Sequence, residues 1–241
     1  MLGPFVRKVE KQGRLTDEER DVLTSMSART KVFRRHEEIV AEGSRPDYST
    51  LIVDGFAIRH NHLRDGRRQI TAVHVPGDFA DLHSFLLKHL DDGVAALTTC
   101  TVAFVGHSDL KQITQRYPYL TRVLWFTTLV DGAVHRAWMT GLGAMEAHER
   151  VAHFFCEFRD RLRWVELVNQ DHYDLPLTQE ELADTLGMSG VHMNRTLQDL
   201  RGQGLISVKG KAVTINDWER LKQLAQYDPD YLHLGQQIER D

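Results

Sequence analysis

The residues with the clearest chemical potential share one face of a predicted helix that follows Ser189. This face carries His192, Asn194, Arg195, Gln198 and Asp199. An arginine guanidinium can donate two hydrogen bonds to a guanine edge, and side-chain amides can pair with adenine. We therefore predict that Arg195 reads a base and that Asn194 and Gln198 contact adenine or a phosphate. His192 lies in the first helical turn and is expected to touch the nucleic-acid backbone.

Two predicted helices and a tight turn would place this face on the surface. Thr178 and Glu181 have the spacing of a capping box, which starts the first helix. Gly187 follows, and glycine tolerates the left-handed backbone of a sharp turn between helices. Ser189 can then cap the second helix. This order is typical of a helix-turn-helix whose second helix enters a DNA major groove.

Two short strands after the second helix predict a wing. Residues 205–208 and 212–215 flank the turn Lys209-Gly210-Lys211. From Ser189 to Lys211, four basic residues against one acidic residue give a balance of +3, although the whole chain carries −4. Because phosphates attract such a surplus, we expect Lys209 and Lys211, together with Ser189 and Thr178, to contact phosphates. The alternative is an interaction protein in which the helix pair is vestigial.

Histidines offer a second kind of chemistry. His60 and His62 alternate on a predicted strand and so share one face, and His74 and His83 could approach them in a β-roll. Such a cluster would suit a cupin-like metal enzyme or a metal-sensing regulator, whereas the simpler interpretation is surface or hydrogen-bonded histidines. No glutamate stands at a convincing ligand position. We therefore predict no catalytic residue, no metal site and no cofactor.

The composition is that of a soluble globular chain. The 241 residues are 41% hydrophobic and 27% charged, which is enough for one large domain or two small ones. We see no signal-peptide pattern and no run of about 18 apolar residues, so we expect a cytoplasmic protein with no membrane contact. Cys100 and Cys156 stand among apolar neighbours, which is more typical of inert packing than of a redox switch.

Short alternating runs separated by turn residues fill the first half of the chain. A short helix, capped by Thr16 and Glu19, precedes them. Strands are predicted at residues 49–53, 56–60, 69–75 and 97–105. Strands of this length with glycine turns indicate a sandwich, a jelly roll or a barrel.

A short helix at residues 109–116 and a long one from about Tyr119 to Met145 are predicted next. In the long helix, apolar and small residues recur every three or four positions, which is the pattern of a coiled-coil seam. The seam comprises Leu120, Val123, Thr127, Val130, Val134, Ala137 and Gly141. Either this seam pairs with a second copy or the helix lies on its own β-domain; we adopt the first. The chain then divides into a β-roll at 1–108, a dimerisation region at 109–146 and a winged helix-turn-helix domain at 147–241.

The order of these parts resembles the CRP/FNR superfamily of transcription regulators. The resemblance covers about Thr16 to Trp218. It rests on Asp54-Gly55, Asp65-Gly66-Arg67-Arg68-Gln69-Ile70, Pro76-Gly77-Asp78-Phe79, Glu149-Arg150-Val151-Ala152, Leu177-Thr178-Gln179-Glu180-Glu181-Leu182-Ala183 and Asn194-Arg195-Thr196-Leu197. It implies an α+β protein with an N-terminal double-stranded β-helix, of the jelly-roll or cyclic-nucleotide-binding kind, then a dimerisation helix and a C-terminal winged helix-turn-helix.

The resemblance also implies a mode of action. Members of the superfamily bind double-stranded DNA as homodimers, with recognition helices in successive major grooves of a palindromic site. An effector in the roll would change the relation between the DNA-binding domains, and contact with RNA polymerase is expected.

Several positions of this chain depart from the family pattern. Asp81 stands where the nucleotide-binding members have glutamate, and Asp91 and Asp92 lie where an arginine would pair a phosphate. Because like charges repel, we expect no cAMP binding, and the effector is unknown. The cysteine cluster of the iron–sulfur members is absent. Val191 stands where family members have a glutamate in the recognition helix. The base preference of the family is therefore expected in this chain for Arg195 alone.

Overall fold

Two helices precede a β-roll in the computed structural model, which describes residues 2–26, 29–87 and 89–240. They are α1 (Gly3–Glu10) and α2 (Asp17–Ser25). The predicted capping box of α2 is confirmed, because Thr16 and Glu19 exchange hydrogen bonds of 3.1 and 2.9 Å. The sequence did not predict α1, which packs Phe5 edge-on against Phe79 of the roll.

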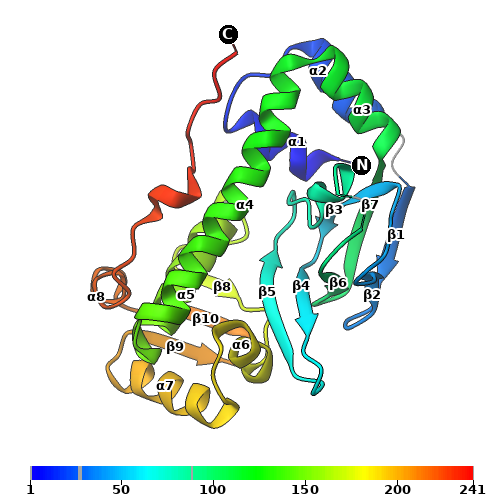
Figure 1. Ribbon diagram of the computed structural model, residues 1–241. Helices are drawn as coiled ribbons and strands as arrows, with labels where there is room; N and C mark the ends of the chain where they lie inside the picture. Colours follow the sequence, from blue (N-terminus) through cyan, green and yellow to red (C-terminus); the bar gives the residue numbers. More distant parts are fainter. Residues whose placement is uncertain (1, 27–28, 88, 241) are drawn as a thin grey trace.

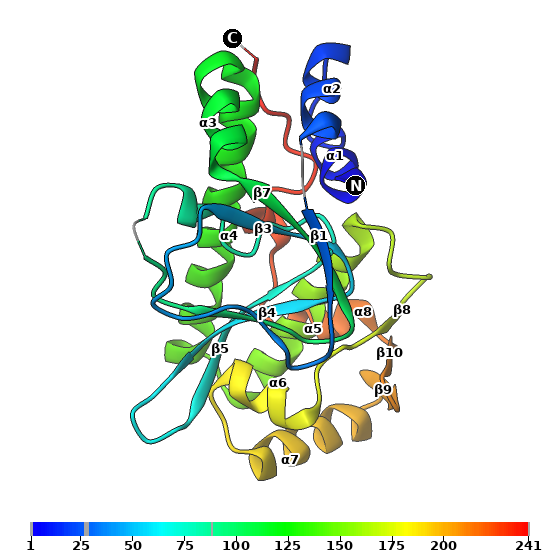
Figure 2. The same ribbon diagram turned by 90° about the vertical axis from the view of Figure 1, so that its right-hand side faces the viewer.

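The β-roll consists of two antiparallel sheets with the strand orders β1-β7-β3 and β2-β6-β4-β5. The strands are β1 (Arg29–Phe33), β2 (Glu38–Val40), β3 (Tyr48–Asp54), β4 (Ala57–His62), β5 (Arg68–His74), β6 (Gly93–Ala96) and β7 (Cys100–Gly106). A buried apolar cluster fills the space between the sheets, with Ile52 and Val102 from one and Val94 from the other. The predicted strands correspond to β3, β4, β5 and β7, and the expected roll is confirmed (Figure 2).

Helices connect the roll to the C-terminal part. They are α3 (His107–Arg116), α4 (Pro118–Ala144) and α5 (Ala147–Trp164). α4 has 27 residues, which is about 40 Å of helix, and runs the length of the molecule beside the roll (Figure 1). The short break between α4 and α5 falls where we placed a domain boundary, and the division into domains stays a prediction.

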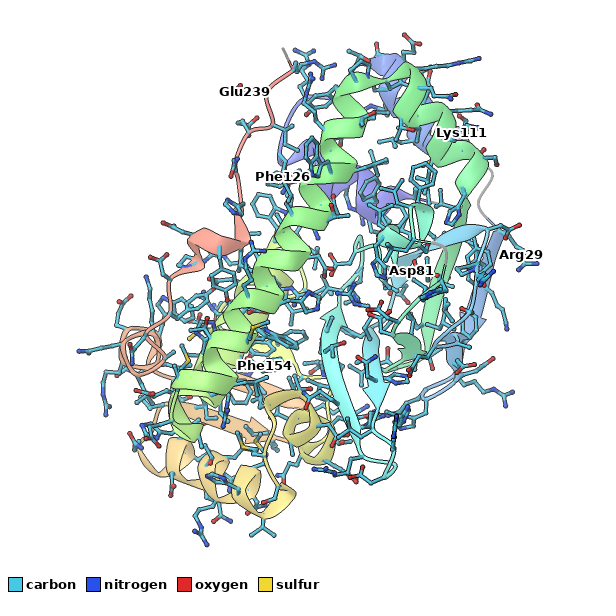
Figure 3. All side chains as sticks on the ribbon, in the orientation of Figure 1. Arg29, Asp81, Lys111, Phe126, Phe154 and Glu239 are labelled. Atoms are coloured by element: carbon cyan, nitrogen blue, oxygen red, sulfur yellow. The ribbon has the colours of Figure 1, made fainter. Side chains whose placement is uncertain are left out.

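The C-terminal part is a small α/β unit. Its elements are β8 (His172–Asp174), α6 (Gln179–Leu186), α7 (Gly190–Gly202), β9 (Ile206–Lys209), β10 (Ala212–Ile215), α8 (Trp218–Leu224) and the 3₁₀ turn η2 (Pro229–Leu232). The strands form one sheet in the order β8-β10-β9. Phe154, Phe155 and Phe158 of α5 are almost fully buried and provide much of its core (Figure 3).

The predicted dimerisation seam of α4 is largely covered by other parts of the same subunit. Leu120 and Val123 are 1% exposed because they pack against the N-terminal helices and α3, and Val134 packs against the roll and α5. Thr127, Val130 and Ala137 are partly exposed beside clefts lined by the same subunit, and Gly141 is buried. The structure therefore supports the alternative that this face of the helix lies on its own β-domain.

A different face of α4 is open to solvent. Its large apolar residues are Trp125, Leu129, Met139 and Leu142, which are 66%, 55%, 69% and 43% exposed. Trp125, Leu129, Gly132, Arg136 and Met139 follow one another at alternating intervals of four and three residues. This spacing is that of a second, unpartnered heptad face. Within the described ranges, no helix is long and apolar enough to cross a membrane.

Candidate DNA-binding interface

The helix α7 presents its predicted polar face to solvent. The Ser189 hydroxyl accepts a hydrogen bond of 3.2 Å from the His192 amide and caps the helix, as predicted. Met193, Leu197 and Leu200 bury the other face. The predicted readers are consequently all exposed: His192, Asn194, Arg195 and Gln198. No hydrogen bond or ion pair to another side chain of the described ranges holds Arg195.

The helix α6 and its turn hold α7 in place. Thr178 accepts from the Glu181 amide at 3.2 Å and Glu181 accepts from the Thr178 amide at 2.7 Å, so the predicted capping box forms. Gly187 has a φ of +62°, a left-handed conformation that glycine adopts without strain. Asn194 donates to the Gln179 carboxamide at 3.1 Å and joins the polar surfaces of both helices.

The wing is a β-hairpin next to α7. β9 and β10 pair antiparallel, and the turn between them leaves Lys209 and Lys211 exposed. β8, which the sequence did not predict, pairs with the other edge of β10. Helices α6 and α7 and the wing strands β9 and β10 lie at one end of the molecule (Figure 1). The residues predicted to contact DNA therefore all belong to one small unit, and their contacts with DNA stay a prediction.

Val191 is a surface residue that the sequence reasoning did not assign to this interface. It is 77% exposed in the first turn of α7. A large exposed aliphatic side chain on an otherwise polar helix face gains nothing from solvent, and apolar side chains can contact the methyl group of thymine. The sequence signal that could have identified Val191 is an apolar residue on the polar face of the predicted helix.

The DNA-binding unit is also tied to the roll of its own subunit. Arg35, in the turn before β2, donates to the Glu181 carboxylate at 2.6 Å. Arg68 of β5 donates to Asp184 at 2.8 and 3.1 Å. Gln69 also reaches the Thr185 carbonyl at 3.3 Å. The first helix of the helix-turn-helix therefore rests on the β4–β5 hairpin, which extends toward it (Figure 2).

Charged side chains occupy the place where an effector of the roll was expected. The Arg59 guanidinium is nearly fully buried and reaches Asp131 of α4 at 2.7 and 2.9 Å. It also lies 3.0 Å from His135 Nε2 and 3.5 Å from the Asp92 carboxylate. An ion pair between the buried Arg59 and the half-buried Asp131 thus joins strand β4 to helix α4.

The aspartate that replaces the family glutamate does not face a ligand. Asp81 is fully buried and accepts hydrogen bonds from the amide and the hydroxyl of Thr50. Burial raises its pKa to about 6. Figure 3 shows the residue among the strands of the roll. Its oxygens are committed to β3, so it is not free to bind a ribose hydroxyl.

The four histidines of the metal hypothesis do not converge. The rings of His60 and His62 lie 4.9 Å apart, edge to face. His74 is buried elsewhere, 3.9 Å from Asp78. His83 instead approaches Asp91 and Asp92. A single four-histidine site, cupin-like or sensory, is therefore wrong for these side chains.

The two cysteines have the environment of packing residues. Both are free and almost completely buried. Burial raises the pKa of Cys100 to about 12, and it raises the pKa of Cys156 further. A thiol that stays protonated is a poor nucleophile, so this environment does not favour redox chemistry.

Comparison with known proteins identifies the family. Residues 30–117 match the model of the cyclic nucleotide-binding domain, and residues 149–224 match that of the Crp-like helix-turn-helix domain. The transcriptional activatory protein AadR of Rhodopseudomonas palustris is 30% identical over 194 residues, which are 78% of each chain. The chain belongs to the CRP/FNR family of transcription regulators.

Other members of the CRP/FNR family show the same relation. The transcriptional activator protein FnrL of Cereibacter sphaeroides is 28% identical over 202 residues, 82% of this chain and 81% of that one. The structure of FixK2 from Bradyrhizobium japonicum superposes with a TM-score of 0.76 at 28% identity, covering 83% of this chain and 98% of that one. The α+β architecture and the role as a DNA-binding transcription regulator are thereby confirmed.

Proposed function

We propose that this CRP/FNR regulator binds a two-fold symmetric DNA site as a homodimer, with α7 of each subunit in a major groove. The observation that carries the proposal is the exposed Arg195, which has no side-chain partner in the described part of the chain, on a helix whose other face is buried. Asn194, Gln198 and Val191 stand beside it as further base contacts. His192, Thr178, Ser189, Lys209 and Lys211 supply contacts to phosphates.

The dimer forms through the open face of α4. Trp125, Leu129 and Met139 expose large apolar side chains along about four turns of one helix. Large exposed apolar side chains that recur on one helix face mark an interaction site, and heptad spacing fits a second copy of the same helix. Parallel pairing of two α4 helices places both recognition helices at the same end of the dimer.

Two further features of the regulator are its contact with RNA polymerase and its effector. Because several relatives are named as transcriptional activators, we propose that the bound dimer contacts RNA polymerase. The effector is not cAMP, since Asp81 is occupied by Thr50 and Asp91 and Asp92 would repel a phosphate. An effector in the roll can act on α4 through Arg59 and on α6 through Arg35 and Arg68.

Replacement of Arg195 tests the role of α7. Arg195→Ala is expected to weaken binding to the specific site by about 1–3 kcal/mol, because a bidentate contact to guanine is lost. Fluorescence anisotropy with the selected site, at stated salt, measures this loss. Arg7→Ala is the matched control, because Arg7 is exposed on α1 at the opposite end of the molecule. Equal affinities of the two variants would remove Arg195 from the interface.

A charge on the open face of α4 tests the dimer. Leu129→Glu is expected to give monomers in sedimentation experiments at micromolar concentration, because two carboxylates would face each other across the helix pair. Leu63→Glu is the control, since Leu63 is 50% exposed but lies in the turn after β4. The assignment of this face fails if Leu129→Glu sediments as a dimer while remaining folded.

A further inference from the structure

Three potential metal ligands meet at the edge of the roll. His83, in the 3₁₀ turn Leu82–Phe85, faces Asp91 and Asp92, which directly precede β6. One ligand atom from each of the three side chains lies within 4.8 Å of the other two. His83 is partly exposed and Asp91 is exposed, so both side chains can turn toward a common centre.

The charge around this group favours a cation. Asp81, Asp91 and Asp92 all lie near His83. Asp131 of α4 pairs with Arg59, which also contacts Asp92. Among the described residues, the cation that contacts this group is Arg59, and both oxygens of Asp131 already bind it. The Asp92 Oδ1 atom is enclosed by protein and makes no hydrogen bond within the described ranges. His83 Nε2 lies 3.8 Å from this oxygen, which is beyond hydrogen-bond distance, and a metal ion bound between the two would satisfy both atoms.

We propose that His83, Asp91 and Asp92 bind a divalent transition-metal ion, and that this ion is an effector of the regulator. The second clause rests on the proposed function, whereas metal binding itself does not. Imidazole nitrogen and carboxylate oxygen are ligands of zinc, iron and manganese, at about 2.0–2.2 Å for zinc. The three side chains must therefore close by roughly an ångström, and the remaining coordination positions fall to water.

The ligand set discriminates between ions and explains the departure from the family pattern. A histidine nitrogen favours transition metals over Mg²⁺ and Ca²⁺, which prefer oxygen ligands. The two aspartates that would repel a cyclic phosphate are the same ones that attract a cation.

Asp92 connects the site to the long helix. Its Oδ1 atom is 3.8 Å from His83 Nε2, and its Oδ2 atom is 3.5 Å from Arg59 Nε. A metal ion that takes the charge of Asp92 leaves Arg59 to Asp131 alone. Occupation of the site thereby changes the charge balance at the junction of β4 and α4, the helix that carries the proposed dimer face.

Zinc titration of the full-length protein tests the site. Calorimetry with Zn²⁺ in metal-free buffer is expected to show one ion per subunit, and Zn²⁺ is expected to raise the thermal midpoint. His83→Ala should weaken zinc affinity at least tenfold, and Asp91→Asn, at an exposed position, should weaken it without any risk to folding. A large excess of Mg²⁺ or Ca²⁺ should not displace the zinc.

Two matched controls and one independent measurement complete the test. His89→Ala and His62→Ala remove other exposed histidines near the roll surface and should leave zinc affinity unchanged. Zinc affinity that survives His83→Ala and Asp91→Asn, or that His62→Ala abolishes, would overturn the assignment. DNA binding is measured separately on metal-free and on zinc-loaded protein, and equal DNA affinities of the two forms would reject the effector role. A chain that binds its DNA site but no zinc rejects the metal site alone, and one that binds zinc but no DNA rejects the proposed function alone.

Discussion

His74 is a buried residue that binds a proton more readily in the unfolded chain than in the folded one. It is 2% exposed, and burial lowers its pKa from 6.5 to about 3, although Asp78 and Asp131 oppose the shift. Between these two pKa values the unfolded chain binds a proton that the folded chain does not. The stability contributed by neutral His74 is therefore complete above pH 6.5 and is lost progressively as the pH falls toward 3.

Replacement of His74 should flatten this part of the pH profile. From pH 7.5 to pH 5, the wild-type free energy of unfolding should fall by about 2 kcal/mol more than that of His74→Gln, because glutamine does not titrate. Urea unfolding at several pH values gives both curves. Parallel curves would mean that His74 is protonated as readily in the folded chain as in the unfolded one.

The roles of several residues in the C-terminal half could be predicted from the sequence because each role depends only on neighbouring residues. Thr178 and Ser189 cap helices, Gly187 takes a positive φ, and Arg195 remains outside after the apolar residues are buried. The second partner of Glu181 could not be predicted. Its carboxylate closes the capping box and also binds Arg35, which is 146 residues away in the chain.

The docking of α6 on the roll depends on that double role of Glu181. The Glu181 side chain is 4% exposed, and Arg35 is 28% exposed. Arg35→Ala is expected to lower the free energy of unfolding by about 1–3 kcal/mol, because it leaves a buried carboxylate without its cation. Urea unfolding, followed by circular dichroism, measures the loss.

A double variant separates the ion pair from the helix cap. Glutamine can still close a capping box, so Glu181→Gln removes the charge without removing the cap. Arg35→Ala combined with Glu181→Gln should therefore be more stable than Arg35→Ala alone. If the double variant is the less stable of the two, the ion pair is not what holds α6 to the roll.

Elements that depend on distant partners were the ones that sequence reasoning missed or misplaced. The strand β1 is exposed over most of its length and shows no alternation, and β6 is a short Gly-Val-Ala-Ala run buried throughout. In α4, apolar residues recur on more than one face. Periodicity establishes that such a stripe exists, but whether Leu120 or Trp125 faces inward depends on which parts of the fold cover the helix.

The C-terminal tail contacts the segment that joins α1 to α2. After α8 the chain returns along α4, where His233 packs against Phe126, and it ends beside the N-terminal helices (Figures 1 and 3). The Ile238 amide donates to the Gln12 carbonyl at 2.9 Å. Arg240 binds both oxygens of Glu19 at 2.7 Å across 221 residues of sequence. No short sequence motif predicts such a long-range contact, so the sequence predicts no role for the tail.

The molecule therefore couples its parts at several places: the roll to α4 through Arg59, the roll to α6 through Arg35 and Arg68, and the DNA-binding unit to the N-terminal helices through the tail. Such contacts fix the position of each recognition helix relative to the open face of α4. In a symmetric dimer, this position sets the spacing of the two half-sites on DNA.

Selection of bound DNA from a random pool, at stated salt and with the full-length protein, tests this arrangement most directly. We expect a two-fold symmetric consensus whose half-sites are about one helical turn apart, bound by two subunits. An asymmetric consensus, or no enrichment above the starting pool, would contradict this arrangement.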